Sequence, residues 1–470
     1  MTITRKKNNP PANWIEFVKT GFFAMLIAAF CVACGQDAGA EQRPDQVRSV
    51  LEGEITLSAE VDSIPDFSGF EILVGERTDD GMDTLAFSTT GKDGTFAMEV
   101  VAPRTNIYSL IIAREGSILR VDEIAIADGD SASFKVQFPF GRRPIMIRSV
   151  ENAALMGFKN TVALHNNEMD NFSRERVEDR SVYANKIFQT AEILWGLQAS
   201  SEGTLASDLA AAQSIVMLEN WNDSLVVARA KALSPDNVNY GNVVGAARRS
   251  QVRIAGAEAG PALLKMLKDK VTDEDIKAVV QSELVLAYRD NENDEDALVA
   301  ARELKMQYAT DSSWIRWADR AIFDLEKLRP GMDAPAFSLT DNEGKKITLE
   351  SFAGKYLVVE FYAPSPEFVP EMIARNAFYR AEGAANQFEI LSISLQSDAE
   401  LNEAFFDGRD FPGRHVFLEN GVSSKVVKDY NIYLLPTRFL VDPTGKLVGK
   451  YVLQNGVNAY QEALALSTAE

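Results

Sequence analysis

Cysteine is almost absent from this chain of 470 residues, and its two copies, Cys31 and Cys34, both stand in an apolar run near the N-terminus. The other residues carry no thiol, which excludes disulfide bonds and thiol catalysis within them. Histidine is as rare, and His165 and His415 are far apart in the sequence. Two lone histidines argue against a metal site, and we expect each to be an ordinary core or surface residue. No cofactor is expected.

Basic residues are outnumbered by acidic ones. Lys and Arg total 48 against 68 for Asp and Glu, which gives a formal net charge of −20. Such a surface repels nucleic-acid phosphates and anionic lipid headgroups, so no nucleic-acid partner is expected. The hydrophobic fraction of 46% is enough for sizeable cores. The length favours about three domains.

The N-terminal segment differs from the rest of the chain. A basic start precedes the apolar run GFFAMLIAAFCVAC, which is short for a membrane span and typical of a secretory signal. Its end resembles a bacterial lipobox, because small residues precede Cys34 and Gly35 follows, although Cys31 stands where Leu is usual. The alternatives are an ordinary signal peptide cleaved nearby and an uncleaved anchor helix.

The lipobox resemblance implies a signal peptide over residues 1–34, lipidation at Cys34 and a polar tether over residues 35–46. Acyl chains on Cys34 would hold the protein to a membrane of the cell envelope. No Asp follows the cysteine directly, which by resemblance to enterobacterial sorting favours the outer membrane, with the protein facing the periplasm.

Residues 47–145 alternate apolar and polar side chains between turn signals, which predicts β-strands. Asp93-Gly94 in TGKDGTFAMEV is a strong hairpin signal. The pattern resembles the small β-sandwich that often precedes thioredoxin-like domains in envelope proteins of Bacteroidetes-like bacteria, so we expect a β-sandwich. The candidate strands are VLEGEITL, FEILVG, DTLAFSTT, TFAMEVV and IYSLIIA.

From residue 147 to residue 328 the apolar residues recur at helical spacing, which predicts an all-α middle domain. Ala297 and Leu304 share one helix face. A second stripe begins with Trp314 and Trp317, which we expect to be core residues. The helical pairs bear a weak likeness to tetratricopeptide-type repeats, with irregular spacing.

Residues 331–470 resemble thioredoxin-like domains of the TlpA and AhpC/TSA type. The likeness rests on the stretch that begins GMDAPAFSLTDNEG and ends YLVVEFYAPSPEFVPEM, on the strand FEILSISLQSD, and on DYNIYLLPTRFLVDPTGKLVGKYV. It implies a C-terminal α/β domain with a mixed sheet and helices on both faces. The whole chain is therefore expected to be multidomain.

The residues that carry this family's chemistry are missing. In thioredoxins a strand like YLVVEFYA leads to CxxC at the start of a helix, whose N-terminus lowers the pKa of the attacking thiol. That register puts Pro366 and Val369 at the two cysteine positions, so no catalytic residue is expected. The chain can instead be aligned from Pro364 with the peroxiredoxin pattern PxxxTxxC. Phe368 then stands at the position of the threonine and Glu371 at the position of the cysteine. This alignment excludes peroxide reduction through a cysteine as well.

Two features of the family's site remain. Glu360 matches the strand carboxylate that assists thiol proton transfer in thioredoxins; without thiols we expect a structural role, paired or water-bound. Leu435-Pro436-Thr437 resembles the loop whose cis-proline positions extended peptides. An alternative interpretation is that this loop only maintains the geometry of the fold. The candidate groove is lined by Tyr362, Pro366, Phe368, Leu435, Pro436 and Thr437.

The sequence therefore predicts a lipid-anchored envelope protein whose redox-inactive thioredoxin-like domain acts as a binding or scaffold module for an envelope protein partner. The alternative is a member of a thiol-disulfide oxidoreductase pathway that works with a cysteine-bearing partner. A third interpretation places binding in the helical domain and treats the other domains as spacers, because a fold does not fix a function.

Overall fold

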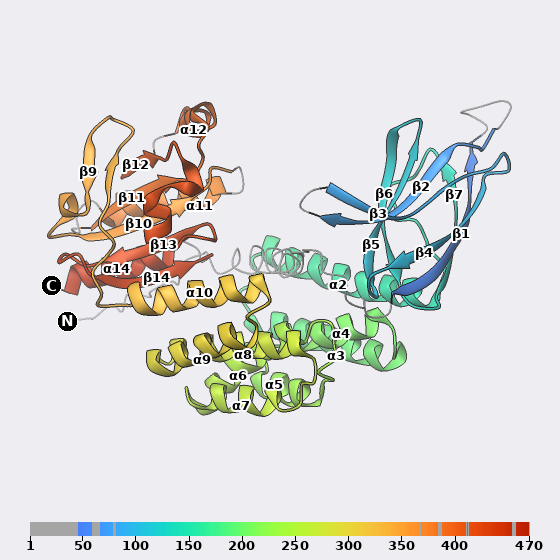
Figure 1. Ribbon diagram of the computed structural model, residues 1–470, viewed down its shortest axis with the longest axis horizontal. Helices are drawn as coiled ribbons and strands as arrows, with labels where there is room; N and C mark the ends of the chain where they lie inside the picture. Colours follow the sequence, from blue (N-terminus) through green and yellow to red (C-terminus); the bar gives the residue numbers. More distant parts are fainter. Residues whose placement is uncertain are drawn as a thin grey trace, which may run out of the picture. The chain divides into compact units, whose positions relative to one another are not determined.

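The structure, a computed structural model, describes residues 46–58, 66–78, 81–365, 368–383, 388–409, 411, 413–453 and 457–469. Cys34, the expected signal peptide and Pro366 lie outside these residues. The chain divides into two compact units, Met1–Glu292 and Asn293–Glu470 (Figure 1). Within the described segments, no helix is both long enough and apolar enough to cross a membrane.

The first unit contains two β-sheets, with strand orders β4-β1-β7 and β3-β2-β5-β6. The alternation of the sequence turns every second side chain inward, and both sheets contribute to one apolar core that includes Leu51, Ile72, Ile112 and Phe134. The five candidate strands correspond to β1 to β5. The strands are β1 (Val47–Leu57), β2 (Phe70–Thr78), β3 (Gly81–Thr89), β4 (Thr95–Ala102), β5 (Asn106–Arg114), β6 (Ser117–Ile126) and β7 (Ser131–Phe138).

The turn at Asp93-Gly94 is present, but the hairpin predicted from it is wrong. β3 pairs with β2, whereas β4 pairs with β1, so this turn carries the chain from one sheet to the other. Gly94 has a φ of +79°, and a Cβ there would lie 2.2 Å from the Ile55 carbonyl oxygen. Glycine is therefore required at this crossing for both conformation and space.

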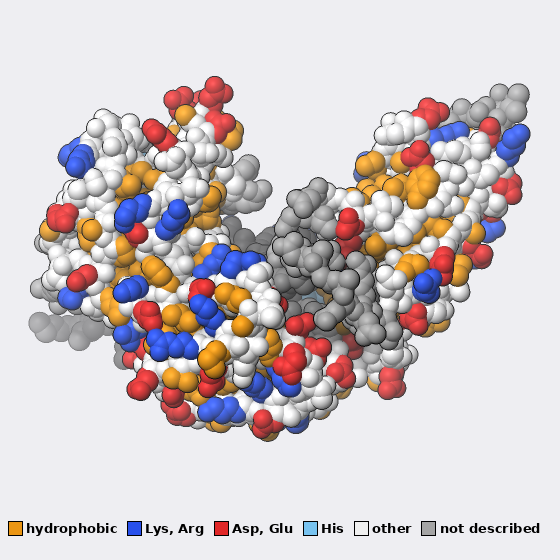
Figure 2. All heavy atoms as spheres, viewed as in Figure 1, with side chains coloured by type: hydrophobic (Ala, Val, Ile, Leu, Met, Phe, Trp, Pro, Cys, Tyr) orange, Lys and Arg blue, Asp and Glu red, His pale blue; other side chains and the backbone are white. Residues whose placement is uncertain are grey.

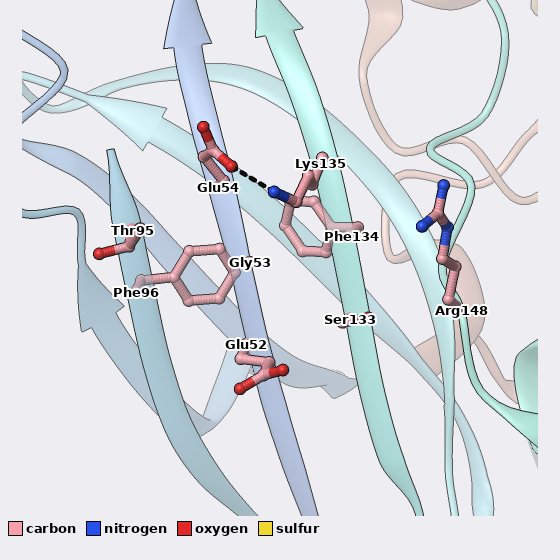
Figure 3. Close-up of a pocket in the computed structure, with 9 residues that line it drawn as sticks. All are labelled: Glu52, Gly53, Glu54, Thr95, Phe96, Ser133, Phe134, Lys135 and Arg148. Carbon is pink, nitrogen blue, oxygen red and sulfur yellow. Dashed lines mark hydrogen bonds and ion pairs between the residues drawn. The ribbon is translucent and has the colours of Figure 1, made fainter. Parts of the chain in front are cut away.

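A second glycine allows two aromatic rings to meet in the three-stranded sheet. Gly53 of β1 is paired with Phe96 on one side and with Phe134 on the other. The two ring centroids are 5.2 Å apart (Figure 3). A Cβ on Gly53 would lie 2.7 Å from the Phe96 ring and 2.5 Å from the Phe134 carbonyl oxygen, so the close contact depends on glycine.

After β7, the described residues of the first unit are mainly helical, as predicted. Side chains at the N-caps, such as Ser149, Thr204 and Asp273, accept hydrogen bonds from the first-turn amides, which explains where these helices begin. The helices are α2 (Val150–Arg174), α3 (Arg180–Ser200), α4 (Leu205–Val216), α5 (Asp223–Ala232), α6 (Tyr240–Ala255), α7 (Ala259–Lys268) and α8 (Glu274–Asp290).

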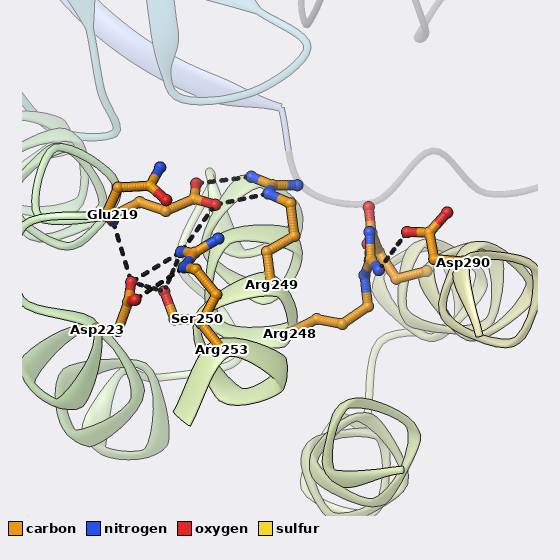
Figure 4. A network of polar contacts seen from close by, with 9 residues as sticks. Glu219, Asp223, Arg248, Arg249, Ser250, Arg253 and Asp290 are labelled. Atoms are coloured by element: carbon orange, nitrogen blue, oxygen red, sulfur yellow. Dashed lines mark hydrogen bonds and ion pairs between the residues drawn. The ribbon is translucent and has the colours of Figure 1, made fainter. Parts of the chain in front are cut away.

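Arginines of α6 tie this helix to its neighbours through ion pairs (Figure 4). The pairs are Arg249–Glu219 and Arg253–Asp223, each at 2.7 Å, and Arg248–Asp290 at 2.8 Å. The hydrogen bond from Arg253 lowers the pKa of Asp223 to about 2, so this carboxylate is ionised near neutral pH. The network links α6 to α8 and to the start of α5.

The second unit begins with a helical hairpin of α9 (Asp294–Gln307) and α10 (Ser312–Lys327). Ala297 and Leu304 of α9 are buried, as the shared face predicted, and Trp314 of α10 is 9% exposed. Asp324 of α10 binds Lys450 Nζ at 2.7 Å, which attaches the hairpin to the domain that follows.

That domain is built around a five-stranded mixed sheet in the order β12-β11-β10-β13-β14. β10 is parallel to β11 and antiparallel to β13, and all seven of its side chains are buried. One face packs against α14 and the end of α11, and the other packs against α13. Helices on both faces agree with the prediction.

The strands of this unit are β8 (Ser338–Thr340), β9 (Lys346–Thr348), β10 (Tyr356–Tyr362), β11 (Phe388–Ser394), β12 (Arg414–Phe417), β13 (Thr437–Val441) and β14 (Leu447–Val452). Its later helices are α11 (Val369–Phe378), α12 (Ala399–Phe406), α13 (Lys425–Asp429) and α14 (Val457–Ala469).

Candidate functional site

The predicted site residues lie around the carboxyl end of β10. This strand ends at Tyr362, and α11 begins at Val369, directly after Phe368 at the N-cap position. The Leu435–Pro436 peptide bond is cis, as predicted. Thr437 pairs in the sheet with the residue before Tyr362, so the cis-proline loop lies beside the end of β10.

The aromatic residues of the predicted groove are not on the surface. Tyr362 is 1% exposed and Phe368 is 8% exposed, and their rings stack with centroids 5.3 Å apart. They pack in one apolar cluster with Phe405 and Phe411. The side chain of a phenylalanine at the N-cap cannot accept a hydrogen bond from the first amides of the helix. Here its ring packs in the apolar cluster instead. These two rings therefore belong to the core.

The cis-proline loop is an accessible part of this region. Thr437 is buried, with its hydroxyl donating to the Leu434 carbonyl oxygen at 2.7 Å, while Leu435 and Pro436 are partly exposed. Leu453 donates its amide to the Pro436 carbonyl oxygen at 2.9 Å. Side chains of Leu434 and Leu453 are 39% and 55% exposed. We call Leu434, Leu435, Pro436 and Leu453 the cis-proline surface.

Glu360 lies at the centre of a buried polar network. Arg438 Nε donates to Glu360 Oε1 at 2.8 Å, and an Arg375 guanidinium nitrogen binds the other carboxylate oxygen. Ser392 and Tyr460 each donate a hydroxyl hydrogen bond at 3.1 Å. None of the three charged side chains is more than 1% exposed. Two arginines from different elements thus compensate one buried carboxylate.

The two guanidinium groups determine the protonation of Glu360. Burial alone would raise its pKa, but the charges of Arg375 and Arg438 outweigh burial and hold the pKa at about 2. Arg438 also binds Glu371 of α11, so two acids face two arginines. A carboxylate with this pKa stays ionised near neutral pH and does not serve as a general base there.

The sequence-based prediction did not include Arg375 and Arg438, although the sequence around Arg438 contains a signal for it. Arg438 interrupts the apolar strand TRFLV, every residue of which is buried, and a charge at such a position needs a partner. Its partner is directly opposite, since Arg438 and Glu360 are paired across β13 and β10. Arg375 gave no comparable signal because α11 (VPEMIARNAF) mixes polar and apolar residues, and a charged residue in such a helix is ordinarily exposed.

The two histidines are core residues, one of the two outcomes that the sequence allowed. Burial lowers the pKa of each to about 4, so both are neutral near neutral pH. His165 Nδ1 lies 3.0 Å from the Thr190 hydroxyl, and His415 Nε2 lies 2.8 Å from the Phe411 carbonyl oxygen. Over the described part of the chain, His, Cys, Asp and Glu form no group of three that could bind a metal ion.

The C-terminal domain matches known proteins in sequence. A profile of the AhpC/TSA family matches residues 330–450. The chain is 32% identical to the thiol-disulfide oxidoreductase ResA of Bacillus cereus over 135 residues, which is 27% of this chain and 73% of that protein. It is 30% identical to ResA of Bacillus subtilis over 129 residues, or 26% of this chain and 67% of that protein.

Solved structures are also similar to part of the chain. The thioredoxin domain of a thiol-disulfide oxidoreductase from Bacteroides vulgatus is 25% identical, with a TM-score of 0.27, and the match covers 30% of this chain and 99% of that one. A thiol-disulfide oxidoreductase from Bacteroides fragilis is 31% identical, with a TM-score of 0.25 and coverage of 28% and 98%.

Proposed function

This chain belongs to the thioredoxin-like redoxin family, and we propose that it is a lipid-anchored envelope protein whose C-terminal domain binds a protein partner without redox chemistry. One observation carries the proposal: the only cysteines of the chain are Cys31 and Cys34, and the thioredoxin register puts Pro366 and Val369 at the two cysteine positions. Neither side chain forms a thiolate or a disulfide.

The surroundings of Glu360 support the loss of redox function. In the resemblance to thioredoxins this carboxylate assists proton transfer to and from a thiol. Here Arg375 and Arg438 hold its pKa at about 2, which makes it a very weak proton acceptor and fits a structural role. The apolar cis-proline surface stays accessible beside it and offers a place for a partner segment.

Insulin-disulfide reduction tests the absence of redox chemistry. We expect no turnover by the purified protein above a buffer control, while a thiol-disulfide oxidoreductase with an intact CxxC gives turnover in the same assay. Any turnover that scales with the amount of this protein and survives its further purification would sink the proposal.

Photo-crosslinking in intact cells tests the binding role. A photo-reactive amino acid at Leu434, on the cis-proline surface, is compared with one at Met306 of α9, which is 77% exposed. We expect one reproducible protein partner from Leu434 and not from Met306. Partners captured only from Met306 would instead place binding in the helical hairpin.

A second candidate function is membership in a thiol-disulfide pathway with a cysteine supplied by the partner. The 32% identity to a thiol-disulfide oxidoreductase over 135 residues favours it. The partner crosslinked at Leu434 distinguishes the two, because this candidate requires that partner to carry a reactive CxxC. A partner without cysteine would eliminate it.

A further inference from the structure

An apolar row crosses the outer face of the four-stranded sheet in the first unit. Leu73 of β2 is paired with Phe87 of β3 and with Ile111 of β5, and Ile111 is paired with Val121 of β6. Paired residues point to the same face of a sheet, so the four side chains form one row across all four strands. We call these four residues the apolar row.

The ends of the apolar row are strongly exposed. Phe87 is 54% exposed and Val121 is 58% exposed, and the adjacent Ile118 of β6 is 66% exposed. The neighbours of the row within its strands point the other way: Ile72 and Ile112 are fully buried in the core. Hydrophobic side chains gather over these strands in Figure 2. Leu73 is partly exposed and Ile111 is 8% exposed, so the row reaches solvent at its two ends, Phe87 and Val121.

The other end of the same face is already covered. Ala125 of β6 lies on the face of Val121, four residues further along the strand, and it packs against Leu155 of α2. Asn152 of α2 caps the Ala125 backbone with hydrogen bonds of 2.9 and 3.0 Å. Helix α2 therefore covers this face near Ala125 and leaves the apolar row to contact something else.

We propose that the apolar row rests on the bilayer surface to which Cys34 anchors the chain. The inference relies on the lipid anchor proposed above. A chain extends by at most about 3.6 Å per residue, so β1, which begins 13 residues after Cys34, starts within about 47 Å of the lipidated cysteine. The anchor thus keeps the two β-sheets at the membrane.

The chemistry of the row fits a lipid surface. The four residues of the row are uncharged, although Glu71 and Glu123 flank the row on the same face. The chain as a whole has a formal net charge of −20 and is repelled by anionic headgroups. The Phe and Val side chains of the row protrude from the sheet, and protruding apolar groups enter the boundary between headgroups and acyl chains without needing a complementary shape. A zwitterionic bilayer held nearby by the anchor satisfies both conditions.

Because the chain has so few cysteines, a single introduced cysteine can be labelled specifically. The full chain carrying V121C is purified in lipidated form from the membrane fraction, labelled at the new thiol with an environment-sensitive fluorophore, and reconstituted into phosphatidylcholine vesicles. The matched control is V50C, because Val50 is a 47% exposed valine on β1 of the other sheet and nearer to the tether. Vesicle flotation first shows whether the protein is anchored.

We expect a blue-shifted emission at V121C and quenching by spin-labelled lipid, neither of which occurs at V50C. Adding F87E should weaken the quenching at V121C, because a charge in the row opposes contact with lipid. If the vesicles float with the protein but both labels show the emission of a fluorophore in water, the inference is overturned, whereas the proposed anchor is not. Crosslinking between V121C chains without lipid quenching would overturn it in favour of a second copy. Failure to float would overturn the anchor as well.

Discussion

At Glu360 the surroundings of one carboxylate decide what the residue does. In a site with thiols, a buried strand carboxylate exchanges protons; here two arginines and two hydroxyl groups surround it. A buried charge that loses its partner is strongly destabilising, whereas the complete network is tolerated. The stability of the C-terminal domain should therefore depend on this residue.

Replacing the carboxylate leaves two buried arginines without their shared partner. We expect Glu360→Gln to destabilise the domain by about 3–5 kcal/mol. Hydrogen exchange of peptides from β10 and β13 reports this domain separately from the first unit. The control is Glu343→Gln, a 75% exposed acid 3.8 Å from Arg414, which should change exchange little. Equal exchange in the two variants would contradict the role given to the network.

The same carboxylate predicts a dependence on pH. Its pKa is about 2 in the folded protein and lies near 4.5 ordinarily, so the unfolded state binds the proton more readily. The stabilisation is complete above pH 4.5 and is lost as the pH falls through 2. Exchange of β10 should therefore accelerate in this window in the wild type, after correction for intrinsic rates, and much less in Glu360→Gln.

At the scale of elements, α10 is held to the C-terminal sheet by polar contacts that converge on one acid. Asp324 is 8% exposed, accepts hydrogen bonds from Lys450 at 2.7 and 2.8 Å, and accepts one from Asn431 at 2.8 Å. Three contacts on a nearly buried carboxylate make Asp324 the residue on which docking of the α9–α10 hairpin depends.

We expect Asp324→Ala to loosen α10 by roughly 3 kcal/mol, because it removes a carboxylate that accepts two hydrogen bonds from the mostly buried Lys450 ammonium. Hydrogen exchange of residues 312–327 measures the effect. Asp319→Ala on the same helix is the matched control, since Asp319 forms an exposed ion pair with Lys305 that should contribute little. If residues 312–327 exchange at the same rate in both variants, α10 is attached to the sheet mainly by apolar contacts and not through Asp324.

Elements with a regular pattern could be predicted, whereas pairings between distant elements could not. Period-two alternation located β1 to β5, and helical spacing located α9 and α10, because both signals are local. The Asp93-Gly94 turn was found, but the strands that it joins pair elsewhere, which a local signal does not reveal. The β-sandwich and the domain boundaries stay predictions.

The candidate site shows the same limit. The cis bond at Pro436 and the buried Glu360 were predicted through the family resemblance. The partner Arg438 lies 78 residues beyond Glu360, and only the register between β10 and β13 brings them together. Phe368 was expected at a groove, yet its ring stacks on Tyr362, because the first turn of α11 turns this side chain inward. Burial of that kind depends on packing and not on sequence spacing.

For the whole molecule, the distribution of cysteine allows a simple test of processing. If Cys34 becomes the lipidated first residue, the mature chain has no free thiol, because its sulfur carries the lipid. We expect a thiol reagent to find none in the denatured mature protein, and mass spectrometry to find an acylated N-terminus. One reactive thiol would indicate cleavage without lipidation, and two would indicate an uncleaved segment.

The arginines around Glu360 also bear on how this protein could change over evolutionary time. Substitutions that placed cysteine at positions 366 and 369 would introduce a pair of thiols, but the Glu360 carboxylate, with its pKa held at about 2, would be too weak a base to take up their protons. Removing Arg375 or Arg438 first would leave a buried charge uncompensated and destabilise the fold. A chain given both cysteines would therefore need further changes around Glu360 before this carboxylate could exchange protons with them.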